Sequence, residues 1–534
     1  MALVINTNLS SLKAQINLDK TQLSLSTSLQ RISTGLRINS PKDDAAGLAV
    51  SQRLSSQIGR LKAAVKNAND GVAFIQSADS ALRGIVAKLE EIQGLASEAV
   101  NGSIDATVRG VLQKQVIAAN ETIGQLADQA KFKGQKVLTG KIVNAEFQVG
   151  LLADESIRVT MPRIIAENLG NYSIRSDNTR DFAIGAARIG DEQGVAQRNF
   201  TQQQTLTIRG FSSSQAGSQV AVEEGETAKS IAEKINATEP LTGVSAVASS
   251  YLTMEDIYDT ASAGIQKISF RLYGVNEKDL NADDPTASAE SISALVKDGT
   301  EESLQDLVSV INAKTSTTGI RAKAFTEVID GQNKIKIALS NGGSDISIEG
   351  FRNDLEGTTA RVGVAEMIVR GFAGTDGAIL GAGTAQDSVT VGGTVALNSA
   401  RTFTATSNVD ETSSLFFSGV DEIPQTAKFD SLASADLSTD ESAKKTLLSA
   451  ASALDFISSL QGEFGAIQSR FEATILNIVA TQENTEAAKS RILDADFAQE
   501  TANLTRAQVL QQAGIAILAQ ANSTPQAVLA LLRT

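Results

Sequence analysis

The sequence predicts a multidomain chain whose N- and C-terminal segments together form an α-helical coiled-coil or bundle core, with β-rich α+β outer domains inserted between them. Three observations predict this fold class. The six prolines leave two long windows without proline, 42–161 and 425–524, and proline breaks helix interiors. Apolar residues recur every seventh position in both windows. Between the windows, the sequence is rich in Gly, Thr, Ser and Val and shows strand-like alternation.

The first window predicts a long helix in a coiled coil, because its apolar residues keep a period of seven. The Asn101-Gly102 pair predicts the end of that helix and a second helix over about 104–130. The first position of the repeat is filled by Leu54, Leu61, Ala68, Ile75, Leu82, Leu89 and Ala96, and we expect its partner position to be Ile58, Val65, Val72 and Val86, interrupted by Asp79 and Gln93.

The second window supplies a helix of matching length to pack against the first. An ordinary intramolecular bundle core explains most of these positions. The seven-residue series consists of Ala450, Ile457, Phe464, Phe471 and Ile478, with Leu460 and Ile467 between them.

The extreme ends predict two further amphipathic helices whose opposite faces carry Ser, Thr, Gln and Asn with little charge. Such helices bury little apolar surface between them, so we expect them to be disordered in the free subunit and to order on assembly. The apolar stripes are Leu9, Leu12, Ile16, Leu25, Leu29, Ile32 and Leu36 at the N-terminus, and Ile492, Leu504, Val509, Ala513, Ile517, Val528, Leu529 and Leu532 at the C-terminus.

The middle contains an internal repeat. Ile235-Asn236-Ala237, followed by Thr242-Gly243-Val244, recurs 76 residues later as Ile311-Asn312-Ala313, followed by Thr318-Gly319-Ile320. A short amphipathic helix is expected before each copy, at 227–234 and 303–310. We therefore predict a duplicated strand–helix–strand unit near 203–250 and 266–326.

Composition excludes several classes of function. With no cysteine and no histidine, the chain cannot form disulfides, zinc–thiolate sites or Ser-His or Cys-His catalytic groups. We therefore expect no enzymatic activity, no metal and no cofactor. A net charge of −14, from 47 basic and 61 acidic residues, argues against nucleic-acid binding. The N-terminus lacks the pattern of a cleaved export signal, and no run of about 18 apolar residues predicts membrane insertion.

Several motifs closely resemble bacterial flagellin. The N-terminal match extends from Leu25 to Ser51 and includes Arg31-Ile32-Ser33-Thr34-Gly35-Leu36-Arg37-Ile38-Asn39-Ser40 and Lys42-Asp43-Asp44-Ala45-Ala46-Gly47. Further matches are Phe132–Leu138, Phe147–Gly150, Ser490–Glu500 and the ending from Gln520 to Arg533. The resemblance covers roughly 1–150 and 440–534.

The resemblance implies the subunit of the flagellar filament, a secreted homopolymer used for swimming. Flagellins are exported unfolded through the flagellar type III export apparatus, and a flagellar secretion chaperone holds the C-terminal helix. They polymerise beneath the filament cap, next to the hook-associated proteins, on the outside of the bacterium.

The resemblance and the helix pattern together divide the chain into three parts. Residues 1–45 and 490–534 would form the inner helical core. Residues 46–175 and 435–489 would form a long-helix rod domain with a small β-hairpin region near 130–160. Residues 176–434 would form the variable, surface-exposed outer domains.

Subunit assembly is expected to use both helical ends and the turn that follows the first one. In that turn, Asp43 and Asp44 read as ordinary helix caps, and the mixed charges also suit ion pairs between subunits. The candidate assembly residues are Leu9, Leu12, Ile16, Leu29, Ile32, Leu36, Arg31, Arg37, Asp43, Asp44, Leu504, Ile517, Val528, Leu529, Leu532 and Arg533.

One motif departs from the family. Many flagellins are sensed by an innate-immune Toll-like receptor through a motif that reads approximately Leu-x-Arg-x-Arg-Glu-Leu-Ala. Here Glu91 and Gln93 stand where the arginines stand, Leu95 is retained, and a supporting Glu falls near Gln115. Reversing a charge at a receptor contact should weaken binding, so we predict weak or absent sensing.

Two alternatives remain open on the sequence alone. A hook–filament junction protein shares similar end regions, although full matches at both ends favour the bulk filament subunit. Alternatively, the middle region of a filament subunit could bind surfaces or carbohydrate.

Overall fold

The computed structural model describes residues 8–101, 104–152, 154–176, 186–190, 197–211, 217–258, 264–276, 288–329, 332–355, 366–371, 378–381, 386–409, 414–416 and 424–532. The chain divides into two compact units. Unit 1 contains Met1–Ser80, Ala130–Pro162 and Gln461–Thr534, and unit 2 contains Ala81–Gln129 and Arg163–Leu460. The long helices α2 (Ala45–Ala99) and α8 (Asp440–Leu493) each contribute to both units.

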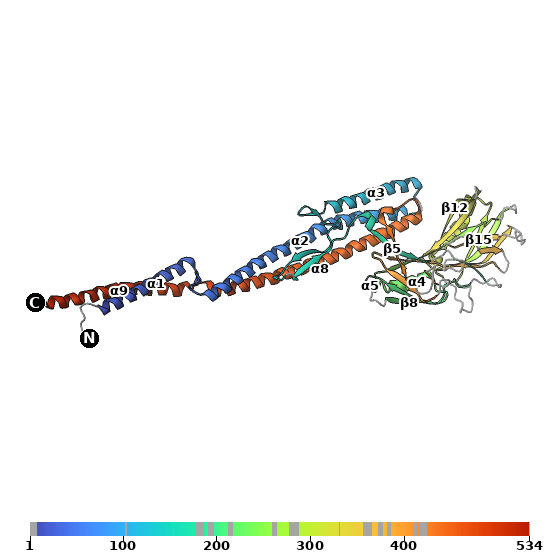
Figure 1. Cartoon of the computed structure of the whole chain (residues 1–534). Coiled ribbons are helices and arrows are strands. Elements are labelled where there is room, and N and C mark those ends of the chain that lie inside the picture. The colour runs from blue at the N-terminus through green and yellow to red at the C-terminus, as the bar shows by residue number, and fades with distance from the viewer. Residues whose placement is uncertain are drawn as a thin grey trace. The chain divides into compact units, whose positions relative to one another are not determined.

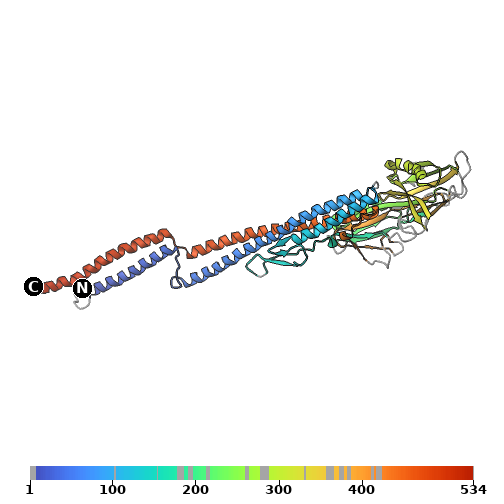
Figure 2. The same ribbon diagram turned by 90° about the horizontal axis from the view of Figure 1, so that it is seen from above.

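Unit 1 contains two antiparallel helix pairs. In Figures 1 and 2, α1 (Leu9–Thr34) runs beside α9 (Phe497–Leu532). The part of α2 before Ala81 runs beside the part of α8 after Leu460, and we call these two segments the α2–α8 pair. Lys62 and Glu486 form an ion pair of 3.5 Å across it. The predicted helical core from both ends of the chain is therefore confirmed.

Local sequence sets the ends of α1 and α9. The side chain of Asn8 caps α1 by accepting a hydrogen bond from the Ser11 amide at 3.0 Å. Helix α1 ends at Gly35, whose φ of 70° is left-handed and favours glycine. The carboxylate of Asp496 accepts from the amide of Ala498 at 2.9 Å and so caps α9.

The seam of α2 differs in part from the prediction. The predicted series is buried from Leu61 to Ala96, and its first member, Leu54, is half-buried. The predicted partner position is buried at Ile58 but wrong beyond it, because Val65, Val72 and Val86 are only half-buried. The buried partner position lies one residue earlier and is filled by Ala64, Gly71, Ala78, Ile85, Ile92 and Ala99.

Side-chain volume explains this shift. A Cβ on Gly71 would lie 2.5 Å from Cζ of Phe471, so the bare backbone of α2 makes room for that ring. A core filled to crystal-like density pairs small residues with large ones, and here the small residues lie on α2. The spacing of large apolar residues alone therefore predicted the wrong partner position for most of α2.

Two hairpins pack on the α2–α8 pair through aromatic rings, in the region predicted near 130–160. Phe74 lies 5.6 Å from Phe132 and 5.6 Å from Phe147, measured between ring centroids. Phe147 lies 5.6 Å from Phe471 of α8. The hairpins are β1 (Lys131–Phe132) with β2 (Gln135–Lys136), and β3 (Ala145–Gln148) with β4 (Ser156–Val159).

In unit 2, helix α3 (Ala106–Gln129) holds the chain that leads into α8. The Gln113 side chain donates to the Ala435 carbonyl at 2.9 Å and accepts from the Leu437 amide at 2.7 Å. The Asn120 side chain donates to the carbonyl of Leu432, in the short helix η2 (Leu432–Ser434). These bonds satisfy backbone groups that would otherwise be buried without partners.

The rest of unit 2 is built mainly from three antiparallel sheets. The five-stranded sheet has the order β11-β10-β14-β17-β6, and the four-stranded sheet has the order β20-β19-β7-β8. The eight-stranded sheet has the order β12-β13-β9-β18-β5-β21, with β15 on β9 and β16 on β15. The elements are η1 (Ala166–Asn168), β5 (Gly170–Arg175), β6 (Ala187–Ile189), β7 (Gln204–Arg209), β8 (Ser218–Val222), α4 (Ala228–Asn236), α5 (Glu239–Thr242), β9 (Ser245–Glu255), β10 (Gln266–Tyr273), β11 (Glu290–Val296), α6 (Glu301–Ala313), α7 (Thr315–Thr318), β12 (Arg321–Ile329), β13 (Gln332–Asn341), β14 (Ile346–Leu355), β15 (Glu366–Arg370), β16 (Ala378–Gly381), β17 (Val389–Val391), β18 (Thr394–Ser399), β19 (Thr404–Ser407), β20 (Gln425–Thr426) and β21 (Lys428–Ser431).

The 76-residue repeat corresponds to two modules of the same order. The first runs β7-β8-α4-α5-β9 and the second runs β10-β11-α6-α7-β12. Asn236 bonds both backbone groups of Ala246, donating at 3.0 Å and accepting at 2.6 Å. Asn312 does the same for Ala322, at 3.0 and 2.8 Å. The repeated Asn therefore fastens each helix to the strand that follows it.

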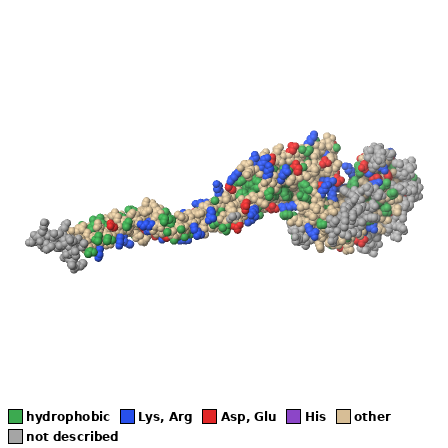
Figure 3. All heavy atoms as spheres, viewed as in Figure 1, with side chains coloured by type: hydrophobic (Ala, Val, Ile, Leu, Met, Phe, Trp, Pro, Cys, Tyr) green, Lys and Arg blue, Asp and Glu red, His purple; other side chains and the backbone are tan. Residues whose placement is uncertain are grey.

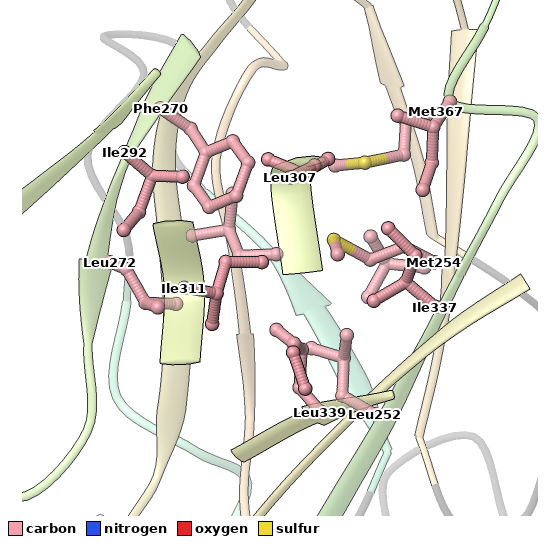
Figure 4. Packing of buried hydrophobic residues seen from close by; sticks show 14 of the residues in the cluster. Leu252, Met254, Phe270, Leu272, Ile292, Leu307, Ile311, Ile337, Leu339 and Met367 are labelled. Carbon is pink, nitrogen blue, oxygen red and sulfur yellow. The ribbon is translucent and has the colours of Figure 1, made fainter. Parts of the chain in front are cut away.

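Two buried cores each lie mainly in one module, and β9 contributes to both. In the second core, side chains from α6, β9, β10, β11, β13 and β15 meet (Figure 4). The first core gathers residues from α4 and from strands such as β7 and β8, and includes Leu206, Val220 and Ile235.

Candidate assembly surfaces

Helices α1 and α9 meet through small and polar side chains. Ala14 and Ser28 of α1 and Ala507 of α9 are buried. A Cβ on Gly514 would lie 3.2 Å from Cδ1 of Leu18, so this glycine lets the two helices approach closely. The buried residues of the contact are therefore small or polar, whereas larger apolar ones that face it, such as Leu18 and Leu25, are only half-buried. Its hydrophobic stabilisation is correspondingly limited.

Neutral hydrogen bonds hold the far part of this contact. Gln511 donates to Gln22 at 3.2 Å. Beyond it, Ser11 donates to the side chain of Asn522 at 2.7 Å, and Asn8 donates to the Ala521 carbonyl at 2.9 Å.

A buried carboxylate lies at the other end of the contact. Glu500 of α9 is only 7% exposed. Its Oε1 accepts from the Ser28 hydroxyl at 2.9 Å and lies 3.6 Å from Nη1 of Arg31. Its Oε2 accepts from the Asn503 side chain at 3.3 Å. The structure thus places the candidate Arg31 in an ion pair within the chain.

Large aliphatic side chains of both helices are exposed instead. On α1 they are between 47% and 69% exposed, and on α9 between 52% and 60%. Apolar side chains are visible along the narrow α1–α9 segment in Figure 3. They are Leu9, Leu12, Ile16, Leu23 and Leu29 on α1, and Val509, Leu510, Ile515 and Ile517 on α9.

The candidate assembly residues of the helices do not share one surface. Among them, Leu9, Leu12, Ile16, Leu29 and Ile517 are exposed, whereas Ile32, Leu36 and Leu504 are half-buried. Leu25 and Ile32 continue the seven-residue spacing of Leu18 toward α9, so the expectation of one stripe on α1 is wrong. The side chains of Val528, Leu529 and Leu532, and the whole of Arg533, lie outside the described residues.

The turn between α1 and α2 is tied to the end of α8. Nη2 of Arg37 donates to the Ile492 carbonyl at 2.7 Å, and the Arg37 amide donates to the Leu493 carbonyl at 2.6 Å. Leu36 forms an isolated antiparallel bridge with Asp494. A guanidinium at the C-terminus of a helix also complements the helix dipole. Arg37 therefore caps α8 within its own chain.

The two aspartates of the turn accept hydrogen bonds from backbone amides. Oδ2 of Asp43 accepts from the amides of Asn39 and Ser40 at 3.0 and 2.8 Å. These bonds, first the one from the Ser40 amide, hold the pKa of the Asp43 carboxyl below its ordinary value. Asp44 accepts from the Gly47 amide at 2.8 Å and caps α2. These contacts support the helix-cap interpretation for Asp44, whereas Asp43 stabilises the turn itself. Ion pairs between subunits stay a prediction.

The candidate receptor residues lie on α2 and α3. Glu91 is exposed and pairs with Lys88, one turn earlier, at 2.7 Å. Gln93 and Leu95 are half-buried, and Gln115 of α3 is exposed. This surface therefore presents a carboxylate that is already paired with a lysine.

Sequence reasoning missed Ser28, Glu500 and Gly514. None of them is a large apolar residue, so a search for aliphatic stripes passes over them. A signal was present: small or polar residues recur every seventh position at Ala14, Thr21 and Ser28, and at Ala507, Gly514 and Ala521. Such a series is typical of closely packed helices.

The described residues offer neither a metal-binding cluster nor a membrane-spanning helix. No three His, Cys, Asp or Glu side chains of these residues are grouped to hold a metal ion. None of the described helices is long and apolar enough to cross a membrane.

Comparison with known proteins identifies the family of both ends. Residues 5–142 match the bacterial flagellin N-terminal helical region, and residues 448–532 match the bacterial flagellin C-terminal helical region. The chain is 35% identical over 537 residues to the B-type flagellin of Pseudomonas aeruginosa, with all of both chains covered. It is 29% identical over 558 residues to a flagellin of Salmonella muenchen, again with full coverage of both.

A solved structure, flagellar hook-associated protein-3 from Legionella pneumophila, covers 83% of this chain and 98% of its own. Its identity is 11% and its TM-score is 0.33, so this likeness carries no argument for a junction protein. The full-length match to curated flagellins favours a filament subunit over a junction protein. The chain belongs to the bacterial flagellin family, whose members are the structural subunits of flagellar filaments.

Proposed function

We propose that this chain joins its filament through the exposed aliphatic surface of the α1–α9 pair. The observation that supports this is the placement of side chains. The buried residues of the pair are small or polar, and nine large aliphatic side chains among the described residues lie outside. Covering a side chain that is about half exposed contributes roughly 1 kcal/mol. Several such side chains, covered by neighbouring subunits, would drive assembly.

The same placement explains why a free subunit would stay soluble. The α1–α9 contact buries too little apolar surface to offset the conformational entropy lost when both helices order. We infer that these helices are disordered in the monomer and order when neighbours cover them. The α2–α8 pair, which buries Ile75, Phe464 and Phe471, is stable by itself.

We propose three layers for the filament. Residues 1–45 and 490–534 form the inner core, residues 46–175 and 435–489 the next layer, and residues 176–434 the outer surface. The charge distribution supports the last assignment, because residues 176–434 carry a net charge of −15 and the remaining residues together carry +1. A charged surface favours solvent, whereas a nearly neutral core can pack.

Export and assembly partners follow from the family resemblance. We propose secretion through the flagellar type III export apparatus to the outside of the cell, and growth beneath the filament cap next to the hook-associated proteins. A flagellar secretion chaperone at α9 would cover Val509, Leu510, Ile515 and Ile517 before assembly. We expect neither catalysis nor nucleic-acid binding.

Truncation tests the assembly proposal. Deleting residues 1–36, or 497–534, should leave a soluble monomer that keeps its far-ultraviolet circular dichroism per remaining helix and does not extend seeds. Deleting 259–263, in the outer region, is the matched control and should leave seed extension intact. A chain that still polymerised after losing either end would contradict the proposal.

We also propose that this chain is a weak ligand of the Toll-like receptor. The Glu91 carboxylate, paired with Lys88, would meet a receptor surface complementary to arginine. Glu91→Arg combined with Gln93→Arg should raise receptor signalling by purified monomer. Glu98→Arg, at an exposed acid on the same helix, is the control and should not. Signalling by the unchanged monomer at the level of a typical agonist flagellin would contradict this proposal.

A further inference from the structure

We propose that Glu500 sets the register between α1 and α9, an inference that rests on the proposed function because it assumes that this pair exists in the filament. The pair needs one defined register, since sliding one helix along the other would move the exposed aliphatic side chains relative to each other. Their match to neighbouring subunits would then be lost.

The bridge between Leu36 and Asp494 ties the two segments together where α1 ends, but apolar packing along the helices does not define their register. The α1 contact repeats Ala14, Thr21 and Ser28, and the α9 contact repeats Ala507, Gly514 and Ala521. A slip of seven residues therefore places small residues against small residues again. Close packing distinguishes such registers weakly, whereas a single buried polar residue in a coiled coil specifies register well.

Glu500 distinguishes them because its partners are not repeated. It is buried, accepts a hydrogen bond from Ser28 of α1 and forms an ion pair with Arg31 of α1. A slip one way would put Thr21 and Ser24 in their places, which keeps a hydroxyl and removes the cation. A slip the other way would put Gly35 and Ile38 there, which removes both. Leaving a buried carboxylate without its donors costs far more than a change between small side chains.

The geometry of the contact provides a direct assay. The chain has no cysteine, so introduced thiols react without background. A Cβ on Gly514 would lie 4.0 Å from Cβ of Leu18, within the range that a disulfide spans. Leu18→Cys with Gly514→Cys reports the observed register, and Leu18→Cys with Ala507→Cys or with Ala521→Cys reports slips of seven residues.

The test compares three side chains at position 500. Each cysteine pair is combined with the native Glu500, with Glu500→Leu or with Glu500→Gln, assembled onto seeds with excess unmodified subunits, and oxidised in the filament. Disulfides within one chain are then quantified by peptide mass spectrometry. Gln is the conservative variant, because its amide oxygen still accepts a hydrogen bond from Ser28.

With Glu500 we expect the 18–514 disulfide alone. Glu500→Leu should lower its yield relative to the slipped pairs by roughly tenfold or more, or exclude the subunit from the filament, and Glu500→Gln should restore it relative to the 18–521 disulfide, whose register offers no hydroxyl to position 500. If the Leu variant gave only the 18–514 disulfide at native yield, or if Gln behaved as Leu, the register proposal would be overturned. Absence of the 18–514 disulfide with Glu500 in place would instead contradict the proposed pairing in the filament.

Discussion

The two helix pairs of unit 1 share an antiparallel arrangement and place their apolar side chains in opposite ways. The α2–α8 pair buries Ile75, Phe464 and Phe471 against small residues such as Gly71. The α1–α9 pair buries Ala14, Ser28 and Ala507 and exposes large aliphatic side chains such as Leu12 and Ile517. The first pair is therefore suited to fold within a single chain. The second is suited to order when neighbouring subunits cover it.

The largest difference between the pairs should appear when a ring is removed from the first. Phe471→Ala leaves a cavity beside Gly71 and Phe147, and should lower the free energy of unfolding of the monomer by about 3–5 kcal/mol. Leu510→Ala, on the exposed surface of α9, should change it by less than about 0.5 kcal/mol. Chemical denaturation followed by the helical circular dichroism signal measures both, and equal losses would contradict the comparison.

Adding one carbon inside the α2–α8 pair should also lower the stability of the monomer. Gly71→Ala places a Cβ 2.5 Å from the Phe471 ring and should destabilise the monomer by about 1–3 kcal/mol. Gly59→Ala is the matched control, because nothing lies within 4 Å of the new Cβ and alanine favours helix. The control should be neutral or stabilising in the same denaturation experiment. If both variants lost stability equally, close packing at Gly71 would not be the cause.

The second pair should respond in assembly and not in monomer stability. Leu12→Ala removes part of an exposed aliphatic side chain on α1 and should raise the critical concentration for seed extension by roughly tenfold. Leu241→Ala changes an exposed leucine of the outer region and should leave it unchanged. Sedimentation of filaments against soluble subunits measures the effect. A similar change for both leucines would mean that exposure in general, and not the α1–α9 surface, controls assembly.

The turn between the pairs should show the smallest effect, as a dependence on pH. The pKa of Asp43 is lowered below its ordinary value of 3.8, mainly by the hydrogen bond from the Ser40 amide. Its contribution to the turn is therefore fully present above pH 3.8 and is lost as the pH falls through the lower folded-state pKa. Amide exchange at Asn39 and Ser40, corrected for the intrinsic rate, should lose protection at acid pH in the native chain. In Asp43→Asn, protection should no longer depend on pH in that range, and an unchanged pH dependence would exclude Asp43 as its source.

Much of the helical fold could be predicted because period and proline content are properties of the sequence alone. The buried positions of α8 and the series from Leu61 to Ala96 followed from spacing. The partner seam of α2 could not be predicted from large apolar residues, because the fit between Gly71 and Phe471 depends on two segments 400 residues apart.

The assembly surface was predicted less completely for a similar reason. Leu9, Leu12, Ile16 and Ile517 were found as apolar residues, and they are exposed. Glu500 was not found, because a glutamate near the start of a helix is ordinarily solvated, and only the position of α1 makes it buried. Asn236 and Asn312 could be recognised because they recur in the repeat. Their hydrogen-bond partners could be identified only from the fold.

The most direct test of the central claim is amide hydrogen exchange of the same chain as monomer and as filament, read by mass spectrometry for each helix. We predict that α2 and α8 are protected in both states, whereas α1 and α9 exchange quickly in the monomer and become protected in the filament. Equal protection of α1 and α9 in the two states would contradict the claim that these helices order only when neighbouring subunits cover their aliphatic side chains.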